Sequence, residues 1–564
     1  MRTNQIHLDY PRQTMFQMIE KISREYPEES AYEFYQKKTS YRSFVRQIEE
    51  AAASFLSLGF KRDDVVTICM PNCPQALVCF YALNRVGLVA NMVHPQSAQN
   101  EISYSLSFSS SKSILTLDMF YEKELKSLEN VPQEVIILTA RMQDELPLHL
   151  AGLFVLKEGK KHLNYPSRPK DLLWRRFVRR GKKVSLPDPV YDETHTAVIL
   201  YSGGTSGSPK GICLTDMNFN ALALQAVSAI EVKFHAGLRM LSCMPLFHGF
   251  GLGINLHTIL IHGACCILMP SFNGKTYAKM LIKRKPNFIA GVPTIFDALL
   301  HIPELEDADL SFLMGMFCGG DSLSVELKKK IDRFLKDHNA TIQVREGYGL
   351  TECVTASCLT PKDTYREGSI GLPFPDTYYC IVKPGTDDVL PPGEEGEIIL
   401  RGPTLMQGYL KDPEETALTL RRLADGNIWL YTGDLGMMDE DGFVYFRQRI
   451  KRMIITNGYN VYPSQVENVI DGCPEVSYSC VIGVKDPRRM QRVRAYVVLN
   501  EGYQGSEETR QSILDQISLH IASYALPKEI IFRKELPKTL VGKVAYRLLM
   551  EEAEKENKNQ GETE

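Results

Sequence analysis

The stretch from Ile199 to Asp216, ILYSGGTSGSPKGICLTD, is the densest run of Gly, Ser, Thr and Lys in the chain. A short apolar run enters it, an amphipathic stretch leaves it, and Thr215 or Asp216 is placed to cap a helix. We expect a strand, a glycine-rich loop and a helix start, whose backbone N–H groups can bind phosphate oxygens. Lys210 is flanked by proline and glycine, so the loop differs from the common P-loop, and a surface linker stays open as the alternative.

Four further stretches are polar, rich in glycine and bounded by apolar runs. They are EGYGLTE (346–352), YTGDLG (431–436), RIKRMIITNGYNVYPSQVE (449–467) and PKTLVGKV (537–544). In order, spacing and content, the five motifs resemble the adenylate-forming superfamily, which contains acyl-CoA synthetases, aryl-CoA ligases, firefly luciferase and the adenylation domains of nonribosomal peptide synthetases. The resemblance extends from about Phe16 to Leu549, and five motifs matching in order make it specific.

The chemistry that this resemblance implies agrees with the residue types in the motifs. Activation of a carboxylic acid by ATP drives a carboxylate onto the α-phosphate, so two anions have to approach one another. At about 4 Å and an effective dielectric constant near 20, each pair of unit charges repels by roughly 4 kcal/mol. The site therefore needs cations and oriented hydrogen-bond donors, which act by positioning.

The resemblance implies that every motif contributes to ATP binding. Lys210 would anchor the departing pyrophosphate, Tyr348 would lie against the adenine, and Asp434 would accept both ribose hydroxyls with help from Arg449. Asp321 stands where the family more commonly has a small apolar residue. The implied ATP-binding set is Ser202, Gly203, Gly204, Thr205, Ser206, Gly207, Lys210, Gly319, Gly320, Asp321, Gly347, Tyr348, Gly349, Thr351, Asp434 and Arg449.

The same resemblance implies the catalytic residues. Lys543 would enter the site on a small C-terminal domain and bind both the acyl carboxylate and the α-phosphate, which suits a compact ammonium group on a flexible stem. Thr351 would lie at the α-phosphate, and His248 in MPLFHGFGLG would lie beside the reacting carboxylate. Glu352 and Thr205 would hold Mg²⁺, because a hard cation prefers oxygen ligands.

In this superfamily the small domain rotates after adenylation, so that another of its faces completes the site for transfer to a thiol. The hinge that absorbs the rotation would be Lys451, which is followed by Arg452 where the family commonly has an acidic residue. Gly458 and Tyr459 would border the tunnel for CoA, which needs a small residue.

The acyl pocket motif favours a simple acid as the substrate. His248, Phe250 and Gly251 would form its wall, and the stretch lacks the Asp with which amino-acid-activating relatives pair the substrate ammonium. We therefore expect an AMP-forming acyl-CoA synthetase that uses ATP, Mg²⁺ and coenzyme A on a fatty or aryl carboxylic acid. Two alternatives stay open: an acyl-AMP ligase that loads a carrier protein or an amine, and a non-catalytic nucleotide or acyl binder on the same fold.

The pattern of apolar and polar residues along the sequence indicates an α/β fold with two domains. Helix-like stretches alternate with apolar runs from Tyr41 to about Leu300, β-rich runs follow from Ser369 to Phe446, and a smaller α+β pattern comes after. We expect a large domain (1–448) of two layered α/β subdomains plus a small β-barrel-like unit. A small mobile α+β domain (449–550) would follow, and then a charged tail (551–564) that is frayed.

Composition excludes several classes of partner. The net charge of −3 gives no field for nucleic acid, and the absence of a long apolar run leads us to expect a cytoplasmic protein. Thirteen scattered cysteines without a zinc-type pair are expected in the core. The basic stretch 170–183 is expected to form a surface helix, with a weak membrane-surface contact as the alternative, and a homodimer stays open.

One departure from the family lies in the small domain. Met490 and Gln491 stand where relatives often have Gly-Glu, and neighbouring arginines make this surface basic. A basic surface would suit the phosphates of CoA.

Overall fold

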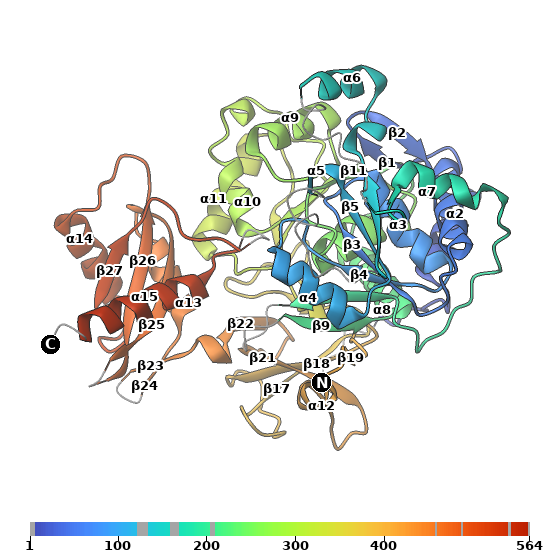
Figure 1. Cartoon of the computed structure of the whole chain (residues 1–564). Helices are drawn as coiled ribbons and strands as arrows, with labels where there is room; N and C mark the ends of the chain where they lie inside the picture. The colour runs from blue at the N-terminus through green and yellow to red at the C-terminus, as the bar shows by residue number, and fades with distance from the viewer. Residues whose placement is uncertain are drawn as a thin grey trace.

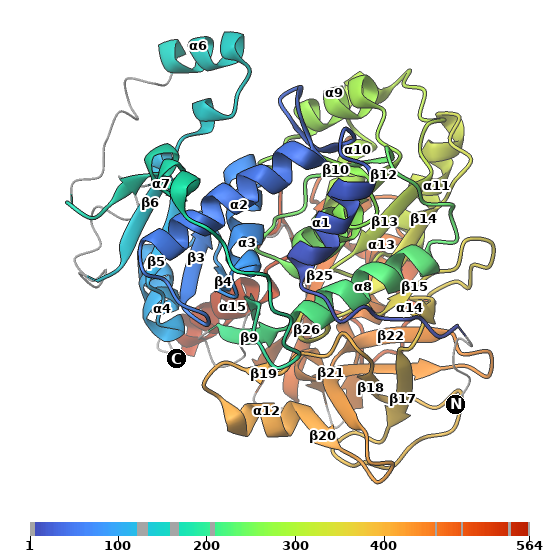
Figure 2. The same ribbon diagram turned by 90° about the vertical axis from the view of Figure 1, so that its right-hand side faces the viewer.

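Two mostly parallel sheets, with helices packed around them, form the larger part of the molecule (Figure 1, Figure 2). The structure is a computed structural model that describes residues 6–120, 134–157, 168–202, 209–456, 459–486, 489–539 and 543–561. In the described part, an eight-stranded sheet has the order β19-β9-β8-β4-β3-β5-β6-β7, and a nine-stranded sheet has the order β16-β15-β14-β13-β12-β10-β11-β1-β2.

The strands of both sheets are short. The eight-stranded sheet contains β3 (Val65–Cys69), β4 (Val89–Met92), β5 (Ser113–Leu117), β6 (Ile136–Ala140), β7 (Leu172–Leu173), β8 (Val198–Ser202), β9 (Lys210–Leu214) and β19 (Gly408–Tyr409). The nine-stranded sheet contains β1 (Ser30–Phe34), β2 (Lys37–Ser40), β10 (Arg239–Ser242), β11 (Cys265–Leu268), β12 (Phe288–Gly291), β13 (Gly315–Gly319), β14 (Val344–Tyr348), β15 (Cys358–Leu359) and β16 (Leu372–Pro373).

Helices connect these strands and cover them. They are α1 (Met15–Glu25), α2 (Tyr41–Ser57), α3 (Pro74–Arg85), α4 (Gln99–Ser109), α5 (Asp118–Phe120), α6 (Leu148–Lys157), α7 (Trp174–Arg180), α8 (Asp216–Ala229), α9 (Gly274–Arg284), α10 (Pro293–Leu299) and α11 (Val325–Asp337), with a π-helix, η4 (Phe250–Thr258). One continuous apolar cluster joins both sheets and their helices, as expected where parallel strands are buried on both faces. The α/β fold class and the layered subdomains predicted from the sequence are confirmed.

The β-rich segment forms an antiparallel sheet of its own. Its order is β17-β18-β21-β20, with β22 paired to β21. The bounds are β17 (Tyr378–Val382), β18 (Gly396–Arg401), β20 (Leu420–Arg422), β21 (Ile428–Met438) and β22 (Val444–Arg449). A short helix, α12 (Pro413–Thr419), precedes β20 and follows β19, so this segment also adds one strand to the eight-stranded sheet.

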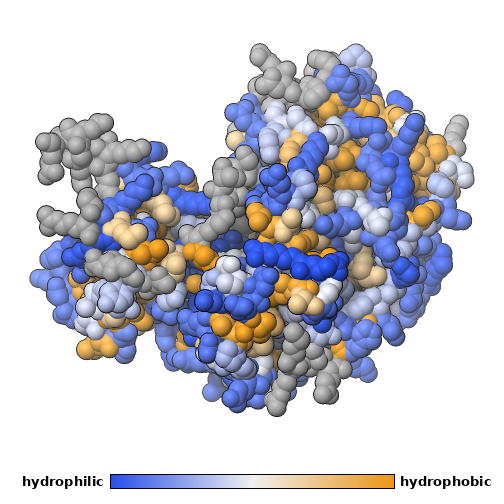
Figure 3. Space-filling view, turned by 90° about the horizontal axis from the view of Figure 1, so that it is seen from below, coloured by the Kyte–Doolittle hydropathy of each residue, from blue (hydrophilic) through white to orange (hydrophobic). Residues whose placement is uncertain are grey.

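The residues after β22 form a smaller α+β lobe that stands beside the large one (Figure 1, Figure 3). The 3₁₀ turn η7 (Ile450–Arg452) leads into it. Its elements are β23 (Ile454–Thr456), β24 (Tyr459–Val461), α13 (Pro463–Asp471), β25 (Val476–Asp486), β26 (Met490–Leu499), α14 (Glu507–Ser518), β27 (Glu529–Phe532) and α15 (Tyr546–Gly561). The strands form one sheet in the order β24-β23-β26-β25, with β27 paired to β26. One apolar cluster joins this sheet to α13 and α14, and another joins it to α15.

The charged tail differs from the sequence prediction, because α15 is helical as far as Gly561. Leu549 and Ala553, one helical turn apart, are buried against the sheet. Ion pairs of Glu552 with Arg533 and of Glu556 with a second arginine lie beside them. Buried apolar contacts therefore stabilise a segment whose composition alone indicates fraying.

The lysine-bearing loop also differs from the prediction of strand, loop and helix start. Residues 203–208 lie outside the described part, and Lys210 begins a second strand, β9, which pairs antiparallel with β8. Helix α8 begins only after β9, where the Thr215 hydroxyl accepts a hydrogen bond from the Asn218 backbone N–H (3.2 Å). The predicted cap is confirmed, but the helix N-terminus does not directly follow the loop.

The basic stretch 170–183 contains α7, whose apolar side chains pack inward. Trp174 and Phe177 are buried, and the Phe177 ring lies 4.7 Å from the ring of Phe55 on α2. The arginines of α7 are exposed, which agrees with the expected surface helix. Within the described residues, no helix is long and apolar enough to cross a bilayer.

The structure shows the surroundings of the cysteines and of Met490 and Gln491, the two residues at which the small domain departs from the family pattern. The thirteen cysteines are free thiols, and all except Cys213 are buried. Gln491 accepts a hydrogen bond from the backbone N–H of Ile455 (2.8 Å) and so ties β26 to β23. Met490 has a φ of 68°, in the left-handed region, where the glycine of relatives would carry no side-chain strain.

Met490 gives a test of this strain. The Met490→Gly variant is expected to stabilise the small domain by about 1 kcal/mol, because an exposed side chain in the left-handed region is strained. Chemical unfolding monitored at small-domain probes measures the change, with Met550→Gly in α15 as a control that should destabilise. Lower stability of Met490→Gly would contradict the strain.

Candidate active site

The site lies where parallel strands of the nine-stranded sheet end. β12, β13 and β14 are neighbours, and Gly319 at the end of β13 is directly opposite Gly347 on β14. The carboxyl ends of parallel strands are where α/β sheets bind ligands. A Cβ on Gly349 would lie 2.1 Å from the Thr355 carbonyl oxygen, so glycine is required for this close backbone approach.

The predicted ribose residues lie on neighbouring strands of one sheet, and the predicted adenine residue reaches them from another sheet. Asp434 on β21 is directly opposite Arg449 on β22, with 3.4 Å between Arg449 Nε and Asp434 Oδ1. The Tyr348 hydroxyl donates to Asp434 Oδ2 at 2.7 Å, although the two residues are 86 positions apart. Asp434 Oδ1 is buried without a hydrogen-bond partner, and burial raises the pKa of Asp434 to about 6. This acceptor fits a ribose hydroxyl.

The two predicted phosphate-side residues are joined by a tyrosine. The Tyr409 hydroxyl donates to Glu352 Oε1 at 2.9 Å, and the Lys210 ammonium lies 4.8 Å from the centroid of the same ring. Lys210 also forms an ion pair with Glu415 on α12. Thr351 and Glu352 belong to the one-turn helix η6 (Thr351–Cys353), which follows β14.

The small domain brings its predicted lysine into this site. A Cβ built on Gly320 would lie 3.6 Å from Lys543 Cε, so the lysine side chain lies on the side of Gly320 where a side chain would be. Burial lowers the pKa of Lys543, while the nearby carboxylates of Asp321 and Asp434 oppose that shift. The Lys543 charge and the Asp434 carboxylate therefore act on one another within the same site.

His248 is a second buried group whose electrostatics involve Lys543. Burial, reinforced by the Lys543 charge, lowers the pKa of His248 to about 3, so its imidazole is neutral at pH 7. His248 Nδ1 accepts a hydrogen bond from the Phe250 backbone N–H (3.2 Å). A Cβ on Gly251 would lie 2.0 Å from the Pro245 carbonyl oxygen, which explains the small residue there.

Close backbone contact joins the His248 motif to the GYGLTE motif. A Cβ on Gly249 would lie 1.7 Å from the carbonyl oxygen of Val354. Val354 itself has a φ of 67°, an unfavourable value for a β-branched residue. Strain of this kind is often found at functional sites.

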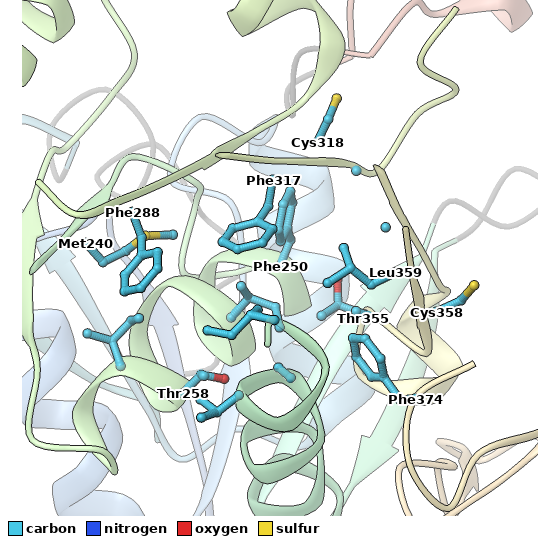
Figure 4. Close-up of a pocket in the computed structure, with 18 of the residues that line it drawn as sticks. Met240, Phe250, Thr258, Phe288, Phe317, Cys318, Thr355, Cys358, Leu359 and Phe374 are labelled. Carbon is cyan, nitrogen blue, oxygen red and sulfur yellow. The ribbon is translucent and has the colours of Figure 1, made fainter. Parts of the chain in front are cut away.

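An apolar pocket extends from the site between α8, η4 and the ends of β12, β13 and β15 (Figure 4). Phe250 and Phe317 lie side by side in its centre, and Met240 with Phe288 forms one end. The Thr258 hydroxyl donates to the Gly253 carbonyl oxygen (2.8 Å), so it does not call for a polar ligand. The lining residues are Ala226, Val227, Ile230, Phe234, Met240, Phe250, Ile254, Thr258, Ile259, Phe288, Phe317, Cys318, Gly319, Gly320, Gly347, Thr355, Ala356, Cys358, Leu359 and Phe374.

The remaining predicted residues are only partly tested. Gly203, Gly204, Thr205, Ser206, Gly207 and Gly458 lie outside the described residues, whereas Ser202 is the last residue of β8. Lys451 lies in η7, between the two domains. Tyr459 is on the edge strand β24 and stacks on Tyr524, with 4.6 Å between ring centroids. Of the three predicted wall residues of the acyl pocket, only Phe250 lines it, and His248 and Gly251 do not.

Sequence reasoning missed two residues of this cluster, Tyr409 and Glu415. Both belong to the stretch GYLKDPEET, where Gly, Asp and Pro indicate a turn and give no sign of a site. The signal that could have found them is the adjacent charge: an acidic helix start would be a natural partner for a lysine of a neighbouring strand.

Comparison with known proteins agrees with this geometry. A family model described as AMP-binding enzyme matches residues 19–410, and one described as AMP-binding enzyme C-terminal domain matches residues 465–543. The chain belongs to the AMP-binding enzyme family. The superfamily predicted from the five motifs is thereby confirmed.

The relatives of this AMP-binding enzyme include curated ligases of matching length. A long-chain-fatty-acid–CoA ligase of Bacillus subtilis is 35% identical over 97% of this chain and 95% of its own. One of Escherichia coli O6:H1 is 30% identical over 96% of this chain and 95% of its own. The prediction of an AMP-forming acyl-CoA synthetase is confirmed at the level of enzyme class.

A solved relative shares the fold of this AMP-binding enzyme. ATP-bound MatB from Rhodopseudomonas palustris superposes with a TM-score of 0.80 and 24% identity, over 96% of this chain and 99% of its own. Because the superposition covers 96% of this chain, the shared fold includes most of both domains.

Proposed function

We propose that this chain activates long-chain fatty acids. It would couple the acid with ATP to form acyl-AMP and pyrophosphate, and CoA would then displace AMP to give the thioester. The observation that carries the proposal is the apolar pocket, whose lining has no charged side chain among the described residues and which reaches Gly319 and Gly320 beside Lys543. The fatty-acid ligases at 30–35% identity support the same substrate class.

In the first half-reaction, the acyl chain would lie in the pocket with its carboxylate at the mouth. Lys543 would bind the carboxylate and the α-phosphate as charge moves between them. Its side chain beside Gly320 and the effect of its charge on His248 support this role. The neutral imidazole of His248 adds no charge and can shape the mouth of the pocket. Positioning and electrostatic stabilisation would thus supply the catalysis.

The nucleotide would be held by residues of the large domain. Asp434 Oδ1, which has no hydrogen-bond partner, would accept a ribose hydroxyl beside Arg449. Lys210 would bind the departing pyrophosphate, and Glu352 would hold Mg²⁺ together with phosphate oxygens. Among the described residues there is no group of three or more His, Cys, Asp and Glu side chains that could hold a metal ion. When bound, Mg²⁺ would neutralise phosphate charge.

In the second half-reaction, the small domain would turn about Lys451. The edge strand β24, which carries Tyr459, would then approach the site, and Lys543 would leave it. A CoA-dependence assay separates this route from loading of a carrier protein or an amine.

The acyl substrate can be tested with a variant that fills the pocket. Ile254 lines the pocket between Phe250 and Thr258 on η4, so Ile254→Trp should block it part-way. We expect kcat/KM for hexadecanoate to fall by about 50-fold and that for octanoate by less than about threefold. In the native chain, each added methylene should raise apparent affinity by about fourfold until the pocket is full.

Pyrophosphate release over a series of fatty and aryl acids measures these effects. Ile282→Trp, at a half-exposed position on α9 outside the pocket, is the matched control. Equal loss on both fatty acids in Ile254→Trp, or native activity on benzoate above that on every fatty acid, would overturn the proposed substrate class.

A further inference from the structure

The residue that the proposed function assigns to the leaving pyrophosphate already has an anionic partner. Lys210 is paired with Glu415, and the side chains are 20% and 34% exposed, so this pair is shielded more than a typical surface ion pair. In the described structure the Lys210 ammonium also lies over the Tyr409 ring. The cation is therefore held by the protein before any phosphate arrives.

The position of Glu415 is fixed by the local fold. Asp412 caps α12 and accepts a hydrogen bond from the Glu415 backbone N–H (3.0 Å). The Thr416 hydroxyl accepts from the Tyr409 backbone N–H (2.8 Å), which ties α12 to β19. A Cβ on Gly408 would lie 2.7 Å from the Thr416 side chain, so helix and strand are in close contact. Glu415 on α12 and Tyr409 on β19 are thus held in a fixed position relative to each other.

The charges of Lys210, Glu352 and Glu415 around Tyr409 are unfavourable for a bound triphosphate while Lys210 is paired with Glu415. The cluster has two carboxylates: Glu352 accepts a hydrogen bond from the Tyr409 hydroxyl, and Glu415 pairs with Lys210. Lys210 is the cation that lies over the Tyr409 ring. Phosphate oxygens at Lys210 would compete with the Glu415 carboxylate for the ammonium, and the two anions would repel each other. Binding of the phosphates has to displace Lys210 from Glu415 or share it.

We propose that Glu415 is a competing counter-ion for Lys210 that weakens the hold on pyrophosphate. Glu415 binds the ammonium in the free enzyme, gives it up to the phosphates of ATP, and takes it back as pyrophosphate departs. It is a positioning residue that acts through Lys210 and touches no reacting atom. The proposal rests on the assignment of Lys210 to the pyrophosphate in the proposed function.

The test measures binding of inorganic pyrophosphate and of ATP to the full-length enzyme with and without this carboxylate. Glu415→Gln keeps the shape of the side chain, and it is expected to tighten pyrophosphate binding and lower the KM for ATP by about three- to tenfold each. Under saturating substrates, kcat should fall or stay level because release slows, while product inhibition by pyrophosphate becomes stronger. Glu414→Gln, at the exposed neighbouring position of α12, should behave as the native enzyme.

A second pair of variants separates this proposal from the assignment on which it rests. Lys210→Met should weaken pyrophosphate binding, and Glu415→Gln should have no further effect in that background. Weaker or unchanged pyrophosphate binding in Glu415→Gln, with the expected loss in Lys210→Met, would overturn the counter-ion role alone. Unchanged binding in Lys210→Met would overturn the assignment of Lys210 and the counter-ion role with it. Glu415→Ala provides the same comparison if the Gln variant folds poorly.

Discussion

Replacing Lys543 with alanine is expected to lower the rate of acyl-AMP formation by about a thousandfold and to leave thioester formation from supplied acyl-AMP and CoA nearly native. The Lys543 side chain lies beside Gly320 and its charge acts on His248. Burial lowers the pKa of Lys543, and the carboxylates of Asp321 and Asp434 oppose that shift. Its ammonium is therefore the small domain's contribution to the site in this arrangement. Loss of one well-placed donor at a charge that develops in the transition state has an effect of this size.

Separate assays of the two half-reactions measure the effect of Lys543→Ala. Pyrophosphate exchange reports on adenylation, and single-turnover conversion of acyl-AMP reports on transfer to CoA. Lys534→Ala, at an exposed position in the same domain, is the control. Gly458→Leu is expected from the sequence to show the reverse pattern. Equal loss of both half-reactions in both variants would rule out a rotating domain.

The Asp434→Asn variant is expected to bind ATP more weakly and yet to be more stable. The asparagine keeps an acceptor for Tyr348 but loses the charge that attracts Arg449 and one ribose hydroxyl acceptor. We expect the KM for ATP to rise by at least about tenfold. In the free enzyme, the variant should be more stable than the native chain at pH 7.5 by about 1–3 kcal/mol.

The sign of this stability change follows from the pKa of Asp434. Burial raises it from 3.8 to about 6, so the carboxyl group binds its proton more tightly in the folded chain than in the unfolded chain. Below the unfolded value the native chain has the full stability of the neutral form, and it loses that stability as the pH rises toward 6. Asparagine resembles the neutral form at every pH, so the difference between the chains should shrink between pH 6 and pH 4.

Chemical unfolding at several pH values and ATP titration measure the two effects of Asp434→Asn. Glu440→Gln, at an exposed position after the same strand, is a control for the loss of a charge. A variant that is less stable at pH 7.5, or a stability difference that does not depend on pH, would contradict the buried charge. Unchanged affinity for ATP would contradict the ribose assignment.

The layered architecture could be predicted from the sequence because the spacing of apolar residues and the motifs are both local features. Alternating apolar runs and amphipathic helices identify the two parallel sheets, and the GYGLTE and YTGDLG motifs each mark one wall of the site. The contact between Tyr348 and Asp434 could be inferred only through the family resemblance. The residues come from different sheets, and no local pattern joins them.

The parts that the sequence did not predict depend on tertiary contacts. Strand β9 was read as the exit of a loop, because KGICL is short and its pairing with β8 and β19 is not local. Glu415 was missed because its partner, Lys210, lies 205 positions away. Residues 551–561 were read as frayed, since only the buried contact of Ala553 distinguishes them from a charged tail.

The end of β22 has a consequence for the fate of the reaction intermediate. Arg449 is the last residue of that strand, and η7 with Lys451 begins at the next position. With the proposed hinge, Asp434, Tyr348 and Glu352 all precede the pivot, and Lys543 follows it. The adenylate can therefore keep its anchors while the groups around its acyl carbon are exchanged, so a reactive mixed anhydride need not diffuse away between the two steps.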